Sequence, residues 1–410
     1  MLLRARTVLP VCSPPIDNGA VLVWGERIEA VGRFRDLRRK HSAKEIDLGA
    51  VILLPGLINA HCHLDYTGMA GQLSPTKNFS DWIKGIVSLK AQWSYSDFAQ
   101  SWLNGAAMLL RSGTTTVVDI ESVPELLPEV TTSTGLDVIS CIELLSVRSR
   151  DSARQMVNAA IEILSSLPAH AAGLSPHAPY TTTPELLRMA ATAARECDRL
   201  LTMHVAESAD EFEMYQRGCG AMFGWLKSQR DMSDCDGVSP IAHLARHGVL
   251  SPKFLAVHAN YLAPGDAKLL GRSRSSVVHC PRSHAFFRHA PFPLAEMDTA
   301  GVNVCLGTDS MATMSKLRGE PFALNLFSEM RVLANSFPAL KPKRILEMVT
   351  VNAAKALGRP RELGRLATGA RADLIAVPHR KSSHPHRAVL DHRGDVSASM
   401  IRGAWVAPVA

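Results

Sequence analysis

Histidine and aspartate residues stand at the ends of several apolar, strand-like segments of this chain. His61 and His63 end one such segment and are separated by a single residue. Because alternate residues of a strand project to the same side, both imidazoles can reach one metal ion. His204 and His258 end two further segments, and Asp309 ends another. Three imidazoles and a carboxylate suit a borderline divalent ion such as zinc and leave room for a water molecule, so the sequence predicts a metal site.

The order of these segments indicates their scaffold. After Pro55-Gly56, apolar β-like runs alternate with amphipathic helical stretches. The runs end near eight positions, which are His63, Ile120, Leu145, His177, His204, His258, His279 and Asp309. Eight such alternations predict a closed parallel α/β barrel with its helices outside. The chemistry of such barrels lies at the carboxyl ends of the strands, where these histidines fall.

The two ends of the chain have a different pattern. Residues 1–54 and 359–410 contain short β-like pieces with glycine turns, such as LLRARTVL and MIRGAWVAPV. We expect both ends to meet in one small β-sandwich subdomain. The barrel is then predicted to span residues 55–358.

Composition restricts the classes of protein that the chain can represent. Its 410 residues are 46% hydrophobic and 20% charged, which is typical of a folded protein with a sizeable core. The net charge of +7 is spread along the chain, which favours an anionic small ligand and argues against a nucleic-acid partner. The 8 cysteines form no C-x-x-C pair, and the sequence has neither a signal peptide nor an apolar run of membrane-spanning length. We therefore expect a cytoplasmic protein with reduced thiols and no membrane partner.

Four motifs, PGLINAHCHLD, HVAES, VHAN and LGTDS, resemble the signatures of the amidohydrolase superfamily, in its branch of aminopurine, guanine and s-triazine deaminases and chlorohydrolases. The resemblance covers nearly the whole chain. It implies a distorted (β/α)8 TIM-like barrel in which His61, His63, His204 and Asp309 bind one divalent ion, zinc in the first place with iron or manganese as alternatives. It also makes His258 a residue that positions the attacking water or the tetrahedral intermediate.

The positions of the lysines in the sequence bear on how many metal ions the site can hold. Many binuclear relatives bridge two ions with a carboxylated lysine on a middle strand. This chain has no lysine between Lys90 and Lys227. We therefore expect a single ion.

Two carboxylates near the predicted ligands are candidates for further roles. Glu207 follows His204 by three residues, and the matching residue of the family is the general acid/base. An alternative role for Glu207 is to stabilise the first turn of a helix beginning near Ser208. Asp309 is expected to take or hold a proton together with His258. Asp65 either orients a ligand or contacts substrate, or it is a polar loop residue.

Other polar residues are expected to contact the substrate. The resemblance makes His177, in GLSPHAPYT, a substrate contact, with a packed polar residue as the alternative. His279 is predicted to face the same cavity. Arg282 and His284, just beyond it, either meet an anionic or hydroxyl-bearing part of the substrate or lie in a solvated loop.

The segments HCPRSHAFFRHAPFPL, LGTDSMAT and SPTKNFSDWIKGI look most like enzymes that deaminate 6-amino-6-deoxyfutalosine, an adenine nucleoside analogue of menaquinone biosynthesis. That substrate carries a benzoate, so an arginine is expected at the barrel mouth, and Arg148 and Arg282 are the candidates.

Three alternatives stay open. One is a deaminase of methylthioadenosine, S-adenosylhomocysteine or adenosine, although those enzymes commonly have a glycine-rich segment where this chain reads SMATMS. A second is a guanine or triazine aminohydrolase or chlorohydrolase. The third is a non-catalytic scaffold. By analogy with the family we expect a homodimer, and the insertion at residues 208–248 is expected to cover either the active site or an interface.

Overall fold

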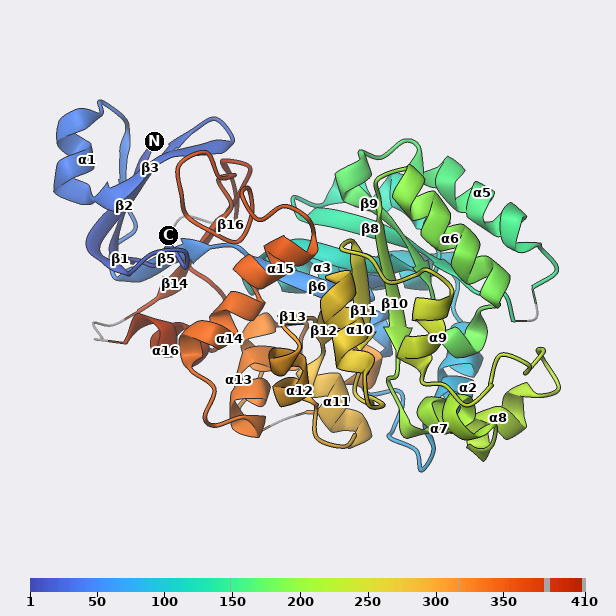
Figure 1. The fold of residues 1–410 in the computed structure, drawn as a ribbon. Helices are drawn as coiled ribbons and strands as arrows, with labels where there is room; N and C mark the ends of the chain where they lie inside the picture. The colour runs from blue at the N-terminus through green and yellow to red at the C-terminus, as the bar shows by residue number, and fades with distance from the viewer. Residues whose placement is uncertain (148, 317, 380–383, 408–410) are drawn as a thin grey trace.

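The computed structural model describes residues 1–147, 149–316, 318–379 and 384–407, which form two eight-stranded sheets (Figure 1). One sheet is all parallel, and its strands follow one another in chain order. These strands are β6 (Leu57–Cys62), β7 (Thr114–Glu121), β8 (Asp137–Leu144), β9 (Ala172–Pro176), β10 (Leu200–Val205), β11 (Phe254–His258), β12 (Ser276–His279) and β13 (Asn303–Leu306). All eight correspond to the predicted strands.

The first and last strands of this sheet meet and nearly close it into a barrel. The backbone N–H groups of Thr308 and Asp309 donate to the carbonyl oxygen of His61 at 3.0 and 3.2 Å, and Cys62 bridges to Asp309. Gly307 makes this approach possible, because a Cβ atom there would lie only 2.8 Å from that carbonyl oxygen. The predicted parallel barrel is confirmed.

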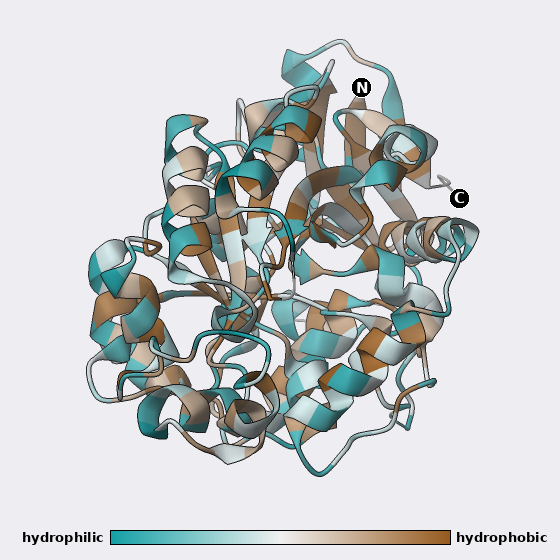
Figure 2. Cartoon of the chain, turned by 90° about the vertical axis from the view of Figure 1, so that its right-hand side faces the viewer, coloured by the Kyte–Doolittle hydropathy of each residue, from teal (hydrophilic) through white to brown (hydrophobic). Residues whose placement is uncertain are grey.

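Helices cover the outside of the barrel, and the sequence specifies their ends. Ser94 and Ser152 form capping boxes at the starts of α3 (Tyr95–Arg111) and α5 (Ala153–Leu164), and Thr183 caps α6 (Pro184–Glu196). Helices of the molecule carry both hydrophobic and hydrophilic residues (Figure 2), and α3, α5 and α6 each bury part of their apolar residues, among them Trp102, Val157 and Leu187. Amphipathic helices of this kind pack one face against the strands. The helices are α1 (Phe34–Lys40), α2 (Phe79–Lys90), α3 (Tyr95–Arg111), α4 (Leu127–Val130), α5 (Ala153–Leu164), α6 (Pro184–Glu196), α7 (Ala209–Arg217), α8 (Gly220–Leu226), α9 (Pro240–Arg246), α10 (Asp266–Ser273), α11 (Pro281–Phe287), α12 (Leu294–Thr299), α13 (Leu326–Ser336), α14 (Pro342–Met348), α15 (Val351–Ala356) and α16 (Pro385–Leu390).

The second sheet joins the two ends of the chain, as predicted. It is mixed, and its order is β16-β15-β14-β5-β1-β2-β3, with β4 paired to β1. Its strands are β1 (Leu2–Val8), β2 (Ile16–Trp24), β3 (Arg27–Arg33), β4 (Glu45–Asp47), β5 (Val51–Pro55), β14 (Leu374–Pro378), β15 (Ala398–Ile401) and β16 (Ala404–Ala407). The chain leaves this sheet at β5 and returns to it at β14, after the barrel is complete. Domain limits at residues 54/55 and 358/359 stay a prediction.

A buried ion-pair cluster connects the two sheets. Asp137, the first residue of β8, pairs with Arg371 at 2.7 Å and also with Arg402 and Arg359. Burial would raise the pKa of Asp137, but the three guanidinium groups hold it below its ordinary value. The cluster therefore fixes the terminal sheet to the base of the barrel.

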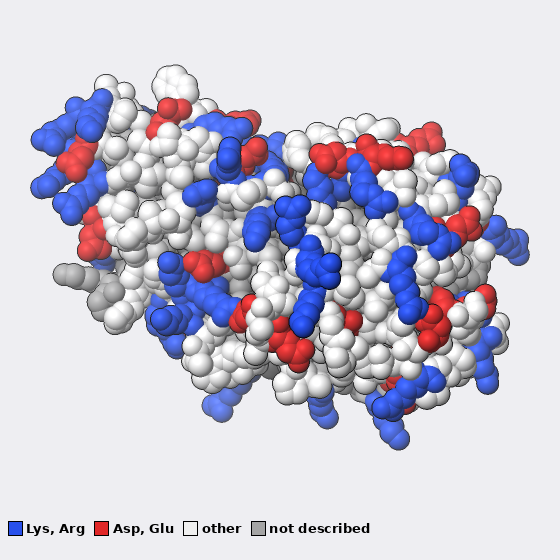
Figure 3. All heavy atoms as spheres, viewed as in Figure 1, with Lys and Arg blue, Asp and Glu red and all other residues white. Residues whose placement is uncertain are grey.

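Charges of both signs are interspersed over the face of the molecule shown in Figure 3. In the part of the chain that the structure describes, no helix is both long enough and apolar enough to cross a lipid bilayer.

Candidate active site

The four predicted metal ligands converge at the carboxyl ends of three barrel strands. His61 and His63 come from β6, His204 from β10, and Asp309 follows β13. One ligand atom from each lies within 4.8 Å of the others. The Nε2 atoms of His63 and His204 are 3.2 Å apart, and Asp309 Oδ1 lies 3.7 Å from His61 Nε2 and 3.8 Å from His63 Nε2. Ligands about 2.0–2.1 Å from a tetrahedral zinc ion stand about 3.4 Å apart, so the spacing fits such an ion.

The hydrogen bonds of the four residues also suit a metal. His204 Nδ1 donates to the carbonyl oxygen of His177 at 3.0 Å, which leaves the lone pair of its Nε2 facing the centre. His61 is fully buried, and neither of its ring nitrogens has a hydrogen-bond partner among the described residues. A buried polar atom without a partner is costly, and a bound cation would satisfy it. The residues present therefore form a buried His/His/His/Asp metal-binding group.

The surroundings set the protonation states that metal binding needs. Burial, together with His61, lowers the pKa of His204 to about 4, and burial also lowers that of His63. Burial would raise the pKa of Asp309, but the imidazole of His61, 3.7 Å away, and those of His258 and His63 hold it well below its ordinary value. At neutral pH His63 and His204 are therefore neutral imidazoles and Asp309 is a carboxylate, which are the forms that bind a metal.

The backbone is strained at this site. His258, Asp309, Ala206 and Ala259 all have positive φ angles, of 71°, 56°, 50° and 48°. A non-glycine residue in this region costs about 1–2 kcal/mol. Such strain is typical of functional sites, where it aims side chains that a regular strand would direct elsewhere.

Glu207 and His258 extend the metal-binding group through Asp309. Glu207 Oε1 lies 3.5 Å from His258 Nε2. The backbone of Glu207 is held on both sides, because its N–H donates to Glu211 at 2.9 Å and its carbonyl accepts from Asn260 at 2.9 Å. Burial, then Asp309 and Glu211, raise the pKa of Glu207 well above its ordinary value. A carboxyl group in that state can donate a proton at neutral pH.

The residues after Glu207, and not Glu207 itself, cap helix α7 and supply the acidic side chains of its first turn. Helix α7 begins at Ala209, and the side chain of Ser208 caps it by accepting from the N–H of Glu211 at 3.2 Å. The acidic residues of its first turn are Asp210 and Glu211. Glu207 precedes the cap and lines the cavity instead.

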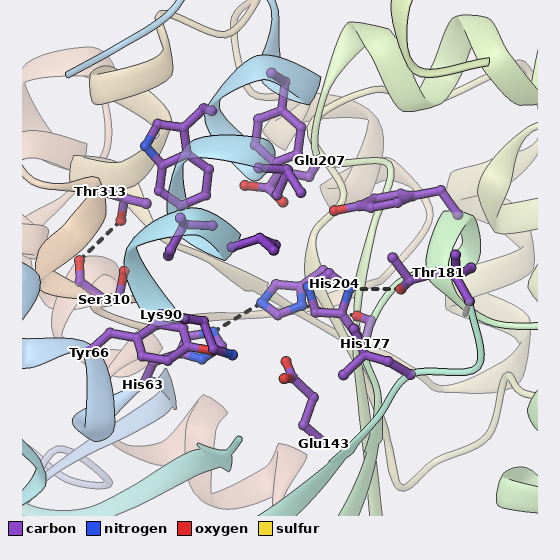
Figure 4. A pocket seen from close by; sticks show the side chains of 18 of the residues that line it. His63, Tyr66, Lys90, Glu143, His177, Thr181, His204, Glu207, Ser310 and Thr313 are labelled. Atoms are coloured by element: carbon purple, nitrogen blue, oxygen red, sulfur yellow. Dashed lines mark hydrogen bonds between the residues drawn. The ribbon is translucent and has the colours of Figure 1, made fainter. Parts of the chain in front are cut away.

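A cavity of about 260 Å³ opens above the metal-binding group (Figure 4). His63, His204, Glu207, His258 and Asp309 line it on one side. Aromatic and aliphatic side chains from α2, α8 and the segment after β9 form much of the remaining wall, among them Phe79, Trp82, Ile83, Tyr180, Trp225 and Leu226. Since α8 lies within residues 208–248, this insertion covers part of the cavity.

The predicted substrate contacts separate into two groups. His177 lines the cavity, and its Nδ1 is 2.8 Å from Thr181 Oγ1. Asp65, His279, Arg282 and His284 are not among the described lining residues. Arg148 falls outside the described residues.

The residues that do not line the cavity have other partners. Asp65 is buried and accepts from Ser122 Oγ at 2.5 Å, and His279 stacks on Phe292 at 3.9 Å. The guanidinium group of Arg282 donates to the carbonyl oxygens of Ala323 at 2.8 Å and Pro321 at 3.5 Å. His284 Nε2 lies 2.9 Å from the carbonyl oxygen of Ala290. These contacts favour positioning roles, and substrate contact by any of the four stays an untested prediction.

Sequence reasoning missed several polar residues of the cavity, among them Tyr66, Lys90 and Glu143. Glu143 had a signal, since it is a charged residue near the end of an apolar predicted strand. Lys90 had none, because its position depends on how α2 crosses the barrel mouth. It lies on a helix and donates to Tyr66, so it is not the strand lysine that bridges two ions.

Comparisons with known proteins agree with this geometry. The curated relatives include 5-methylthioadenosine/S-adenosylhomocysteine deaminases from Moorella thermoacetica, 29% identical over 98% of this chain and 90% of the relative, and from Syntrophobacter fumaroxidans, 30% identical over 90% and 81%. Similar solved structures include an adenosine deaminase from Xanthomonas campestris with bound zinc, at a TM-score of 0.85, 24% identity and coverage of 98% and 92%. The aminofutalosine deaminase of Helicobacter pylori in complex with methylthio-coformycin has a TM-score of 0.86 at 22% identity and 99% coverage of both chains.

A family model carries the assignment. The model of the amidohydrolase family matches residues 52–406, which include the whole barrel and the returning strands of the terminal sheet. With a nearly closed parallel barrel and a buried metal-binding group at its carboxyl end, this chain belongs to the amidohydrolase family and is a hydrolase.

Proposed function

We propose that the protein is a metal-dependent hydrolytic deaminase of a 6-aminopurine nucleoside, with 6-amino-6-deoxyfutalosine as the first candidate substrate. One observation carries the proposal. The buried metal-binding group shares Asp309 with the Glu207–His258 pair, and both groups lie at one side of a cavity with aromatic walls. That arrangement combines water activation, a proton carrier and a surface for a flat heterocycle.

The chain's own residues divide the proton transfers among them. A bound divalent ion lowers the pKa of water from 15.7 toward about 7 and so supplies a nucleophile at neutral pH. Asp309 and His258 hold or accept the proton of the attacking water. Glu207 donates a proton to the ring nitrogen beside the amino-bearing carbon, so that negative charge does not build up on the heterocycle. The proton held by Asp309 and His258 then passes to the amino group, the bond between the ring carbon and this nitrogen breaks, and ammonia leaves.

The choice of nucleoside is supported from two sides. The relatives are named for methylthioadenosine and S-adenosylhomocysteine, and two solved neighbours for adenosine and aminofutalosine, all of which contain adenine. The mouth of the cavity offers apolar surface, since Val87 is 56% and Leu145 42% exposed. Lys84 Nζ lies 5.5 Å from the ring centroid of Trp225 at the same mouth. A benzoate, which combines an aromatic ring with a carboxylate, suits such a surface.

Several further points belong to the proposal. Zinc is the preferred ion, in keeping with the donor set and with the zinc in the Xanthomonas neighbour. The partner is a small aminopurine-type molecule, without nucleic acid or membrane. A cytoplasmic homodimer is the proposed form.

The test is a substrate panel assayed for ammonia release. Metal-loaded protein is offered 6-amino-6-deoxyfutalosine, methylthioadenosine, S-adenosylhomocysteine, adenosine, guanine and an aminotriazine. We expect the highest kcat/KM with 6-amino-6-deoxyfutalosine, and equal rates with adenosine would reject that substrate. The deaminase assignment fails if no 6-aminopurine nucleoside is turned over. A protein that binds no stoichiometric metal would instead be the scaffold alternative.

A further inference from the structure

Two opposite charges line the cavity without forming an ion pair. Glu143 lies near the end of β8, and Lys90 ends α2. The carboxylate of Glu143 makes no hydrogen bond or ion pair with any residue that the structure describes. Figure 4 shows Glu143 and Lys90 around the same space, beside the histidines of the metal-binding group. The carboxylate oxygens of Glu143 and the ammonium group of Lys90 therefore face the same part of the cavity.

Lys90 is held in a fixed place relative to the metal ligands. Its ammonium donates to the hydroxyl of Tyr66 and lies 4.7 Å from the centroid of that ring. The Tyr66 ring in turn stacks on His63, with centroids 5.1 Å apart and planes 7° from parallel. An ammonium has three N–H donors, and the hydrogen bond to Tyr66 uses one of them. Among the residues that the structure describes, the other two N–H donors of Lys90 have no partner and are left for a ligand.

Glu143 and Lys90 each stabilise the charged form of the other. Burial raises the pKa of Glu143, and Lys90 opposes that effect. Burial would lower the pKa of Lys90, but Tyr66, Glu143 and Asp65 hold it above its ordinary value. A ligand group bound between them must satisfy a hydrogen-bond acceptor and a donor together.

We propose that Glu143 and Lys90 bind two neighbouring hydroxyl groups of the substrate, the vicinal diol of a nucleoside's ribose. A hydroxyl is both donor and acceptor, so a diol can donate to both oxygens of Glu143 and accept from Lys90. Glu143 would repel a carboxylate or phosphate, and Lys90 would repel an amine. Tyr66 acts as a positioning residue for Lys90. This inference rests on the proposed nucleoside substrate and extends it from the base to the sugar.

The contacts are set before binding, because Tyr66 already holds Lys90 and a strand carries Glu143. A preorganised site loses less entropy when the ligand binds. Hydrogen bonds to charged groups are stronger than neutral ones, and removal of one hydroxyl should cost about 10- to 100-fold in affinity. Because the diol is remote from the reacting carbon, the loss should appear mainly in KM.

The experiment compares nucleosides that differ by one hydroxyl. Metal-loaded protein is assayed with adenosine, 2′-deoxyadenosine and 3′-deoxyadenosine, and calorimetry measures binding of inosine and 2′-deoxyinosine. We expect each deoxy compound to be about 10- to 100-fold weaker for the natural chain. In Glu143→Gln and Lys90→Met the difference between ribo and deoxy compounds should shrink toward one, while metal content is unchanged. Glu162→Gln, an exposed carboxylate of α5, is the matched control and should keep the full difference.

Each outcome decides the inference. Equal binding of inosine and 2′-deoxyinosine, or binding of neither, overturns it. A discrimination that persists in both cavity variants overturns it as well. If Glu143→Gln fails to fold, the deoxy series on the natural chain and Lys90→Met still give the answer. If no nucleoside is deaminated, the proposed function fails, while the calorimetry still decides the diol site.

Discussion

Replacement of Glu207 by glutamine separates a proton carrier from a metal ligand. The side chain of Glu207 is 8% exposed and lies 3.5 Å from His258, whereas its backbone is held by Glu211 and Asn260. Because those backbone hydrogen bonds do not involve the Glu207 side chain, Glu207→Gln should keep the fold and the shape of the site. The variant loses only the transferable proton.

The size of the effect follows from this single loss. A positioned general acid or base contributes about 10²- to 10⁴-fold to a rate. At about 1.36 kcal/mol for each factor of ten, this is about 2.7–5.4 kcal/mol of activation free energy. The loss should appear in kcat, because the proton moves only in the transition state.

The assay measures steady-state ammonia release together with metal content. We expect kcat of Glu207→Gln to fall by about 10²- to 10⁴-fold while one ion per chain is retained. His204→Gln, which removes a predicted ligand from the same segment, is the comparison and should lose both metal and activity. A Glu207→Gln protein that keeps full turnover would refute the proton-carrier role, and one that loses its metal would show that Glu207 is a ligand.

Three further predictions concern the metal, the barrel closure and the terminal sheet. Removal of the ion by a chelator should abolish activity and lower Tm, and added zinc should restore both; unchanged turnover would contradict a metal mechanism. Gly307→Ala should weaken metal binding, because its Cβ would lie 2.8 Å from the carbonyl oxygen of His61, whereas Gly224→Ala in α8 meets nothing within 4 Å and should be neutral or slightly stabilising; equal metal content in both variants would exclude the steric argument. Asp137→Asn should lower the free energy of unfolding at pH 7 by about 3–5 kcal/mol, since it breaks a buried ion pair with Arg371. Because folding lowers the pKa of Asp137, this stabilisation is present above about pH 4 and is lost as the pH falls further, so a difference between the two proteins that does not shrink in acid would contradict the reasoning.

The sequence predicted the parts of the site that depend on strand order. A parallel barrel brings the carboxyl ends of its strands to one face, so histidines at successive strand ends must come together. His61, His63, His204 and Asp309 do so, although the first and the last are 248 positions apart in the chain. Repetition of one β/α unit made these strand ends recognisable from local pattern alone.

The parts that depend on packing between distant segments were not predictable. Lys90 reaches the cavity because α2 crosses the barrel mouth, and α8 closes part of the wall. For Arg282 the sequence leaves substrate contact and a solvated loop open; in the structure its guanidinium group donates to Ala323, and its backbone N–H donates to Glu329 of α13. A charged residue after a strand end can turn toward any nearby acceptor, and its local sequence does not say which one is close.

The seam between β6 and β13 has a consequence for how the protein is made. During synthesis His61 and His63 leave the ribosome before Asp309. The carbonyl oxygen of His61 cannot accept its two hydrogen bonds until Thr308 and Asp309 have been added to the chain. A nascent chain shorter than this point holds an open sheet with two exposed edges and an incomplete set of donors. The complete set of four metal ligands therefore exists only after Asp309 has been synthesised, and a bound ion would join the first strand of the barrel to the last.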